Sequence, residues 1–307
     1  MSINWYPGHM FKATKEIKEI LNKVQVIIEV VDARLPYSSE NPVIGRLSAD
    51  KPTIKLLNKS DLADPKVTQL WIDHFETQQQ VKAIAVSREQ PEQIRSLSNL
   101  IKQMVPARSV GNINAMIMGI PNVGKSTLIN TLSGRLIAKT GNEPAVTKRQ
   151  QRIILDNGVT LFDTPGILWP KVENQQSAYR LATSGAIKDT AMEYDDVGFF
   201  AAEYLLKYYP ENLKQRYQLD TLPDSELEFL ETIGRQRGAL VSGGLVNLNK
   251  ISKILLTEFR DATLGRISLE RPAMIEQELI ELHIRLEKEA EKKKAKKEAR
   301  KKRISRR

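Results

Sequence analysis

The sequence predicts an α/β fold, with a doubly wound, mostly parallel sheet followed by a small all-α domain. Short apolar, β-branched runs recur at intervals that leave room for a helix between them, at 24–31, 53–57, 81–86, 113–118, 152–155 and 159–162. Most of these runs are apolar throughout, which is typical of strands covered by helices on both faces. After about residue 175 the pattern changes to helices alone, so we expect the sheet to end there.

Helices are expected before the first strand, between strands and throughout the C-terminal part. Before the first strand, apolar residues at i, i+3, i+4 and i+7 share one helix face; they are Ile17, Ile20, Leu21 and Val24. Segments 64–78 and 90–104 can form helices between strands. C-terminal helices are expected over 196–209, from Ser225, over 245–264 and from Pro272 into the charged tail. Ser225 and Glu228 have the spacing of a capping box, and Gly265 should end the helix before it.

The length and composition indicate two domains and a tail. A chain of 307 residues has room for about two domains, which we place at 1–175 and 176–285, with a basic helical or disordered tail at 286–307. The absence of cysteine excludes a disulfide framework and a Cys-ligated zinc site, and it fits the cytoplasm, where we expect the protein. No apolar run approaches the roughly 18 residues of a membrane-spanning helix, so we expect no membrane partner.

Most of the positive charge lies in the tail. The formal net charge of the chain is +10, and residues 288–307 contribute +9 of it, with twelve Lys or Arg and three Glu. Such a run favours an electrostatic contact with nucleic acid; a solvated helix end without a partner is the alternative. Attachment to a membrane surface is disfavoured, because Ile304 is the only large apolar residue in the run.

A glycine-rich loop predicts a phosphate site. Residues 119–126 follow the pattern Gly-x-x-x-x-Gly-Lys-Ser, after an apolar strand and before an apolar helical run, which is the context that this motif requires. Backbone N–H groups and the start of the helix would hold the phosphates, Lys125 would reach the β- and γ-phosphates, and Ser126 would bind Mg²⁺. The residues assigned to this part of the nucleotide site are Asn122, Val123, Gly124, Lys125, Ser126 and Thr127.

A second motif, Asp163-Thr164-Pro165-Gly166, follows the last strand about 40 residues after the phosphate loop. At this position Asp163 is expected to hold Mg²⁺, and the N–H of Gly166 is expected to meet the γ-phosphate. Thr147 lies between the two motifs in a polar, glycine-containing segment. We expect it to close onto Mg²⁺ when the γ-phosphate is present; an ordinary loop threonine is the alternative.

The tetrapeptide Asn58-Lys59-Ser60-Asp61 predicts a guanine-reading site at the end of another strand. Asp61 can accept hydrogen bonds from N1–H and the exocyclic amine of guanine, whereas adenine would leave it partly unpaired; such sites reject the analogue by a factor on the order of 10⁴. Asn58 would meet the other edge of the base, and Lys59 would lie over its ring. The segment after the next strand could offer backbone N–H groups to the guanine oxygen, from Val86, Ser87 and Arg88.

The order of these motifs is unusual, because the base reader precedes the phosphate loop and the Mg²⁺ motif. This order resembles that of circularly permuted GTPases. With Trp5-Tyr6-Pro7-Gly8-His9-Met10 and Asp32-Ala33-Arg34-x-Pro36, the chain resembles the YlqF-type family, also called ribosome biogenesis GTPase A, over nearly its whole length. The resemblance implies a circularly permuted GTPase topology, hydrolysis of GTP to GDP and phosphate, and late assembly of the large ribosomal subunit with its rRNA and proteins as partners. The absence of cysteine argues against a sister group of permuted GTPases that carries a Cys/His zinc module.

Three residues bear on how GTP would be hydrolysed. Ile167 stands where Ras-like proteins have the glutamine that orients the attacking water, so intrinsic hydrolysis should be slow. The resemblance points to His9 as the catalytic residue; a structural or surface histidine is the alternative. Asn122 resembles the asparagine of cation-dependent GTPases, where the side chain helps to hold K⁺. The expected cofactors are therefore GTP or GDP, Mg²⁺ and K⁺.

Two other functions remain open. The first is an RNA-binding assembly scaffold in which GTP is mainly structural, a reading that the lack of a water-orienting group at Ile167 favours. The second is a GTPase that acts on tRNA or in iron transport, since these proteins also have phosphate loops with asparagine. The permuted motif order and the absence of membrane spans disfavour it. We expect a monomer whose hydrolysis is stimulated by contact with the large ribosomal subunit.

Overall fold

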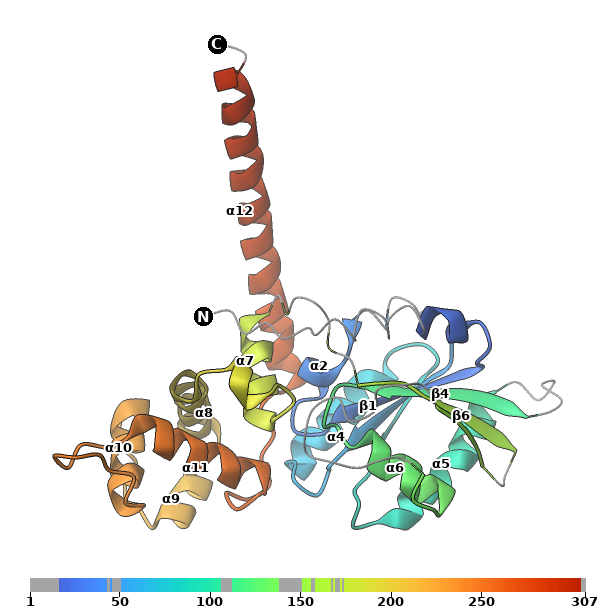
Figure 1. The fold of residues 1–307 in the computed structure, drawn as a ribbon, viewed down its shortest axis with the longest axis horizontal. Helices are drawn as coiled ribbons and strands as arrows, with labels where there is room; N and C mark the ends of the chain where they lie inside the picture. The colour runs from blue at the N-terminus through green and yellow to red at the C-terminus, as the bar shows by residue number, and fades with distance from the viewer. Residues whose placement is uncertain are drawn as a thin grey trace.

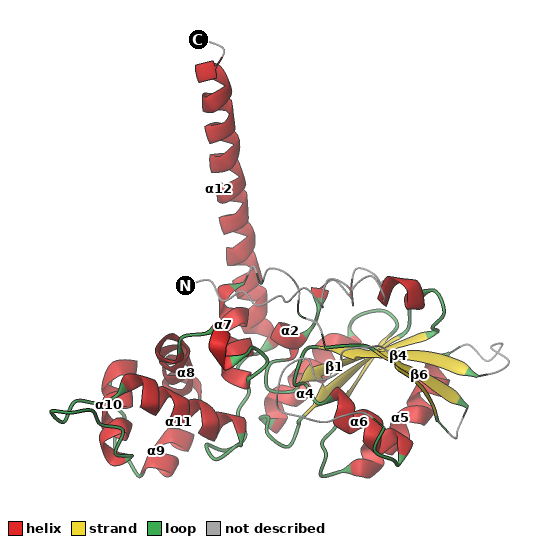
Figure 2. Cartoon of the chain, viewed as in Figure 1, coloured by secondary structure: helices red, strands yellow, loops and turns green. Residues whose placement is uncertain are grey.

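The structure is a computed structural model that describes residues 17–42, 45, 51–105, 112–137, 151–155, 158–166, 168, 172 and 174–304 (Figure 1). A twisted sheet with its helices forms one part, and a group of helices forms the other (Figure 2). A single long helix, α12, projects away from both (Figure 1). His9, Thr147 and Ile167 lie outside the described residues.

The sheet of the described residues has six strands in the order β3-β2-β1-β4-β6-β5. Neighbouring strands pair in parallel except β5, which is antiparallel to β6 at the edge. The strand bounds are β1 Val26–Asp32, β2 Thr53–Asn58, β3 Val81–Ala85, β4 Ile113–Gly119, β5 Gln151–Ile154 and β6 Val159–Asp163. The prediction of a mostly parallel sheet is therefore confirmed.

The apolar runs became strands because both faces of the sheet are covered. Every residue of β1 and β2 is buried. Adjacent residues of a strand point to opposite faces, and Val31 packs in one cluster with Trp71 of α4 (Pro65–Glu76), whereas Val30 belongs to another. That second cluster includes residues of α5 (Pro91–Met104) and α6 (Lys125–Ser133). Helices on both faces are what a doubly wound sheet requires.

The C-terminal part is helical, as predicted. Its elements are α7 Gln175–Ser184, η1 Asp189–Ala191, α8 Tyr194–Tyr208, α9 Pro210–Tyr217, α10 Glu226–Gln236, α11 Leu248–Arg260 and α12 Pro272–Ile304. The predicted cap forms, since the Ser225 hydroxyl accepts a hydrogen bond from the Glu228 N–H at 3.2 Å. We placed α11 at 245–264, which is too long at both ends: the Asn247 side chain caps its start, and Ala262 has a φ of 61°, which ends the helical backbone before Gly265.

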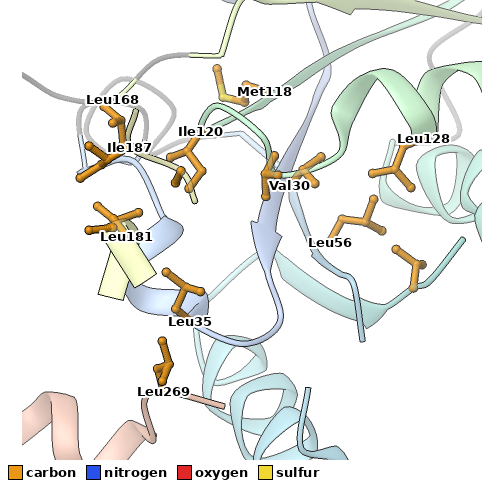
Figure 3. Close-up of a cluster of buried hydrophobic side chains, with 14 of the residues drawn as sticks. Val30, Leu35, Leu56, Met118, Ile120, Leu128, Leu168, Leu181, Ile187 and Leu269 are labelled. Atoms are coloured by element: carbon orange, nitrogen blue, oxygen red, sulfur yellow. The ribbon is translucent and has the colours of Figure 1, made fainter. Parts of the chain in front are cut away.

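The segment after α11 joins the helical part to the sheet by backbone hydrogen bonds. The N–H of Leu269 donates to the carbonyl of Arg34 at 2.6 Å, and that of Ile267 donates to the carbonyl of Leu62 at 3.1 Å. Apolar side chains continue the contact: Leu35, in the turn after β1, lies between Leu181 of α7 and Leu269 (Figure 3). The helical part is therefore packed onto the ends of the strands and is not merely tethered to them.

Glu270 lies at the centre of this junction and is fully buried. Its carboxylate accepts hydrogen bonds from Ser38, in the short helix α2 (Pro36–Ser39), through the backbone N–H at 3.0 Å and the hydroxyl at 2.6 Å. Arg180 approaches to 3.7 Å but makes its own hydrogen bonds to Glu278. Burial raises the pKa of Glu270 to about 7, although Arg180 and Ser38 lower it.

Glu270 should make the stability of the protein depend on pH. The folded protein keeps the carboxyl proton up to a pKa of about 7, whereas an unfolded chain releases it near about 4.3. Between these values the unfolded state binds fewer protons, so the free energy of unfolding from this group falls as pH rises. In urea unfolding from pH 5 to pH 8, Glu270→Gln should lose part of the decline seen in the wild type. Parallel profiles for the two proteins would contradict this assignment.

Candidate functional site

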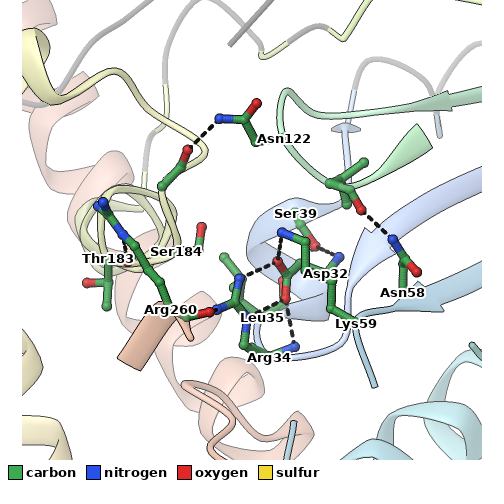
Figure 4. Close-up of polar contacts among 12 residues, drawn as sticks. Asp32, Arg34, Leu35, Ser39, Asn58, Lys59, Asn122, Thr183, Ser184 and Arg260 are labelled. Atoms are coloured by element: carbon green, nitrogen blue, oxygen red, sulfur yellow. Dashed lines mark hydrogen bonds and ion pairs between the residues drawn. The ribbon is translucent and has the colours of Figure 1, made fainter. Parts of the chain in front are cut away.

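The phosphate loop lies between β4 and α6 and is tied to the base-reading tetrapeptide. The Asn58 side-chain amide donates to the carbonyl of Val123 at 2.7 Å (Figure 4). Gly124 has a φ of 98°, and a Cβ there would lie 2.3 Å from Nδ2 of Asn58, so only glycine fits this close approach. In this structure, Asn58 therefore holds the phosphate loop, a contact that the sequence motif alone did not predict.

Asp163 lies at the end of β6 beside this loop and fits a cation ligand. The residue is buried, and among the described residues neither of its carboxylate oxygens has a hydrogen-bond partner. Burial raises the pKa of Asp163 to about 6, although the Lys125 ammonium lowers it. Burial also lowers the pKa of Lys125, against the effect of Asp163. Buried carboxylate oxygens without partners are uncommon, and a hard cation such as Mg²⁺ takes oxygen ligands of this kind.

The remaining phosphate-site residues lie around this pair. Ser126 is half-buried in the first turn of α6, next to Lys125, and Thr127 is exposed. Gly166 packs against the loop so closely that a Cβ would lie 3.0 Å from Cα of Pro121. Thr164 fixes the segment between Asp163 and Gly166 to β4, since its N–H and its hydroxyl both donate to the carbonyl of Ile117. The γ-phosphate sensor predicted from the sequence thus lies against the phosphate loop.

The base-reading segment follows β2, and the neighbouring segment follows β3. Val86 and Ser87 are buried, and the N–H of Ser60 donates to the carbonyl of Val86 at 3.2 Å, so the two segments lie side by side. Arg88 is exposed, and Asp61 is half-buried. Lys59 has a φ of 61°, a left-handed backbone conformation that a non-glycine residue rarely adopts. The structure therefore brings together the residues that we assigned to guanine from two strand ends.

A buried ion pair next to Lys59 was not assigned a role from the sequence. Arg34 donates to Asp32 through Nε at 2.9 Å and through Nη2 at 2.8 Å, and Lys59 donates to the same carboxylate at 3.0 Å (Figure 4). Burial alone would raise the pKa of Asp32, but Arg34 and Lys59 hold it well below its usual range. The signal was present in the sequence, since Asp32-Ala33-Arg34 directly follows an apolar strand, as the nucleotide motifs do.

Asn122 connects the phosphate loop to the helical part. Its backbone has a φ of 57°, and its side-chain amide donates to the carbonyl of Gly185, at the end of α7, at 3.0 Å (Figure 4). The expected role of Asn122 in holding K⁺ stays a prediction, as do the roles of His9 and Thr147, which lie outside the described residues.

Within the described part of the chain, every helix is too short or too polar to span a lipid bilayer.

Comparisons with known proteins identify a matching family and relatives that cover most of this chain. Residues 114–208 match the family of 50S ribosome-binding GTPases. The chain is 44% identical over 289 residues to ribosome biogenesis GTPase A of Priestia megaterium, covering 91% of this chain and 100% of the relative. The corresponding Thermotoga maritima protein is 33% identical over 270 residues, covering 88% of this chain and 95% of the relative.

Solved structures also resemble this chain over most of its length. The crystal structure of GNP-bound YlqF from T. maritima aligns with a TM-score of 0.61 and 31% identity, over 85% of this chain and 98% of that one. The tetrapeptide 58–61 at the end of β2 precedes the glycine-rich loop after β4 and the motif 163–166 at the end of β6, so the permuted motif order is found in a single sheet. The chain is a GTP-hydrolysing, circularly permuted GTPase and belongs to the ribosome biogenesis GTPase A, or YlqF, family.

Proposed function

We propose that the protein binds the precursor of the large ribosomal subunit, promotes its late assembly, and hydrolyses GTP to GDP and phosphate on contact with it. The observation that carries this proposal is the buried Asp163 carboxylate, within a chain 44% identical to a ribosome biogenesis GTPase. This carboxylate has no hydrogen-bond partner among the described residues, and burial raises its pKa although the Lys125 charge lowers it. The matched family is described as 50S ribosome-binding, which favours the large subunit as partner. We also propose that the protein acts in the cytoplasm, as a monomer.

The phosphate site has the residues that GTP and Mg²⁺ require. Lys125 would neutralise the β- and γ-phosphates, and the N–H of Gly166 would contact the γ-phosphate. Ser126, Asp163 and Thr147 would hold Mg²⁺, which neutralises the charge that develops on the phosphates. Asp61 would read guanine, with Lys59 over the ring, and the backbone of 86–88 would meet the guanine oxygen.

Activation of water needs a group other than Ile167, whose side chain can neither donate nor accept a hydrogen bond. We propose that His9 orients the attacking water, and that K⁺, held in part by Asn122, supplies positive charge that an arginine finger gives other GTPases. Both would act only when a partner orders the site, so hydrolysis by the protein alone should be slow.

The surface proposed to contact rRNA lies on the helical part and on α12. Exposed basic side chains suited to phosphate contacts are Arg235, Arg237, Lys250, Lys253 and Arg266. Arg260 is also a basic residue of the helical part, but its guanidinium donates to the carbonyls of Ala182 and Thr183 inside the protein, so it is not part of this set. The basic run of α12 extends away from the body (Figure 1), where it can reach along RNA.

Permutation gives a direct route from the γ-phosphate to this surface. The chain runs from Gly166 to the start of α7 at Gln175 within nine residues. We propose that GTP orders 140–151 and the stretch after Gly166, which presents the helical part to immature rRNA, and that GDP releases it. The alternative is an RNA-binding scaffold in which GTP is mainly structural; subunit-stimulated hydrolysis separates the two.

Large ribosomal subunits should stimulate hydrolysis, because contact would order the water-activating groups. We expect an increase in the rate of phosphate release of about tenfold or more with purified large subunits or their precursors, and none with small subunits. His9→Ala should keep GDP affinity but lose the stimulated rate. Equal rates with and without large-subunit particles, mature and precursor, would favour the scaffold.

Potassium should raise the hydrolysis rate if Asn122 helps to hold it. Turnover measured at equal ionic strength in KCl and NaCl should be several-fold faster in KCl, and Asn122→Asp or Asn122→Ala should reduce the difference. Because both salts screen charge equally, matched rates in the wild type would remove K⁺ from the mechanism.

The basic part of α12 should contribute electrostatic affinity for the subunit. Deleting 288–307 removes twelve cationic side chains, so binding should weaken and its dependence on salt concentration should flatten, since each released counterion contributes to the slope. Binding measured from 50 to 300 mM KCl checks this. If the affinity of the truncated protein depends on salt as steeply as that of the full-length protein, the tail is excluded from the interface.

A further inference from the structure

The C-terminal ends of α7 and α11 meet next to the nucleotide loops, and arginine side chains donate hydrogen bonds to the carbonyls of both ends. The last carbonyls of a helix have no partner within the helix. Arg260 ends α11, and its carbonyl accepts a hydrogen bond from Nη1 of Arg34 at 3.4 Å. The Arg260 guanidinium in turn donates to the carbonyls of Thr183 and Ala182, in the last turn of α7, each at 2.9 Å. Positive charge at helix C-termini is favourable because of the helix dipole.

Each end of this series of hydrogen bonds reaches a nucleotide-binding loop (Figure 4). At one end, Arg34 holds Asp32, and the same carboxylate holds Lys59 of the base-reading tetrapeptide. At the other end, Gly185 follows the last turn of α7, and its carbonyl accepts the Asn122 amide of the phosphate loop. Arg260 lies between these two ends of the series. Its side chain binds the end of α7, and its backbone carbonyl accepts the hydrogen bond from Arg34.

Packing fixes Arg260 and Arg34 in these positions. Only 26% of the Arg260 side chain is exposed, and Asp189 lies 3.7 Å from its Nη1. A Cβ on Gly185, which has a φ of 81°, would meet Nε of Arg260 at 3.4 Å, so the guanidinium lies flat against the turn that presents the Gly185 carbonyl. The Arg34 guanidinium stacks 5.1 Å over the Phe259 ring of α11. Displacing the Arg260 side chain would therefore release the end of α7, whereas the Arg260 backbone carbonyl would still accept the hydrogen bond from Arg34.

We propose that Arg260 is a positioning residue for guanine nucleotide: its side chain holds the last turn of α7, so that Gly185 presents Asn122 in its binding geometry, and its backbone carbonyl supports Arg34 beside Asp32 and Lys59. The helical part then completes the nucleotide site from outside, without touching the ligand. Because coupling between sites is reciprocal, any partner that moves the end of α11 changes nucleotide affinity by the same factor that nucleotide changes the partner's affinity.

The test is a double-mutant cycle on the affinity of the full chain for a fluorescent GDP. Arg260→Ala should weaken GDP binding by roughly fivefold or more, the lower end of typical coupling between sites. The GDP affinity of Arg260→Lys should lie between those of the wild type and Arg260→Ala, since an ammonium keeps the charge but cannot match the planar guanidinium that binds both carbonyls. Asn122→Ala combined with Arg260→Ala should cost less than the product of the two single losses, because both interrupt the same series of contacts.

The matched control is Arg216→Ala, which removes another arginine held by α11. Arg216 donates hydrogen bonds of 2.6 Å and 3.1 Å to Glu258, which lies two residues before Arg260 in α11. Among the described residues, Arg216 has no contact with a nucleotide loop. It should lower stability and leave GDP affinity unchanged. The proposal is overturned if Arg260→Ala binds GDP within twofold of the wild type, if the Arg260 and Asn122 losses multiply independently, or if Arg216→Ala weakens GDP binding equally. Should Arg260→Ala fail to fold, the same cycle with Arg260→Lys decides the matter.

Discussion

The arrangement of the nucleotide loops depends on one buried carboxylate, that of Asp32. A charge in the protein interior is costly unless it is paired and hydrogen-bonded. Asp32 meets this cost with the guanidinium and backbone N–H of Arg34 and with Lys59. These partners come from two directions, since Lys59 belongs to the base-reading tetrapeptide and Arg34 contacts α11 of the helical part. The same ionic contact that neutralises Asp32 thus joins ligand recognition to the second half of the molecule.

Permutation of the chain makes this joining possible. In this sheet the base reader follows β2 and the γ-phosphate motif follows β6, so the chain leaves the phosphate site directly into α7. The segment 267–270 then returns from α11 to pair with Leu62 and Arg34 and to place Glu270 against Ser38. The helical part is held by Asn122 of the phosphate loop at the end of α7, and by Arg34 and Leu62 after α11, so it is suited to respond to the nucleotide. This arrangement therefore favours the proposed assembly switch over a scaffold whose RNA-binding module is loosely attached.

The sequence predicted the features that depend on local pattern. Buried strands such as β1 and β2 follow from continuous apolar runs, and the Ser225 cap follows from residue type and spacing. Contacts between distant residues could not be predicted in this way. Asn122 meets Gly185 across 63 positions, and Arg34 meets Arg260 across 226. Arg260 illustrates the limit, because in the sequence it is one more basic residue on a helix, and only the packing of α7 against α11 shows that its charge is used inside the protein.

Amide hydrogen exchange of the segment after α11, with and without GDP, tests most directly whether the nucleotide loops and the helical part act as one unit. The N–H groups of Leu269 and Ile267 donate to Arg34 and Leu62, whereas that of Glu228 is held by the Ser225 cap, far from the nucleotide motifs in the chain. GDP should slow exchange at Leu269 and Ile267 and leave Glu228 unchanged. Protection confined to the phosphate and base loops, with exchange at Leu269 and Ile267 unaltered, would contradict the account.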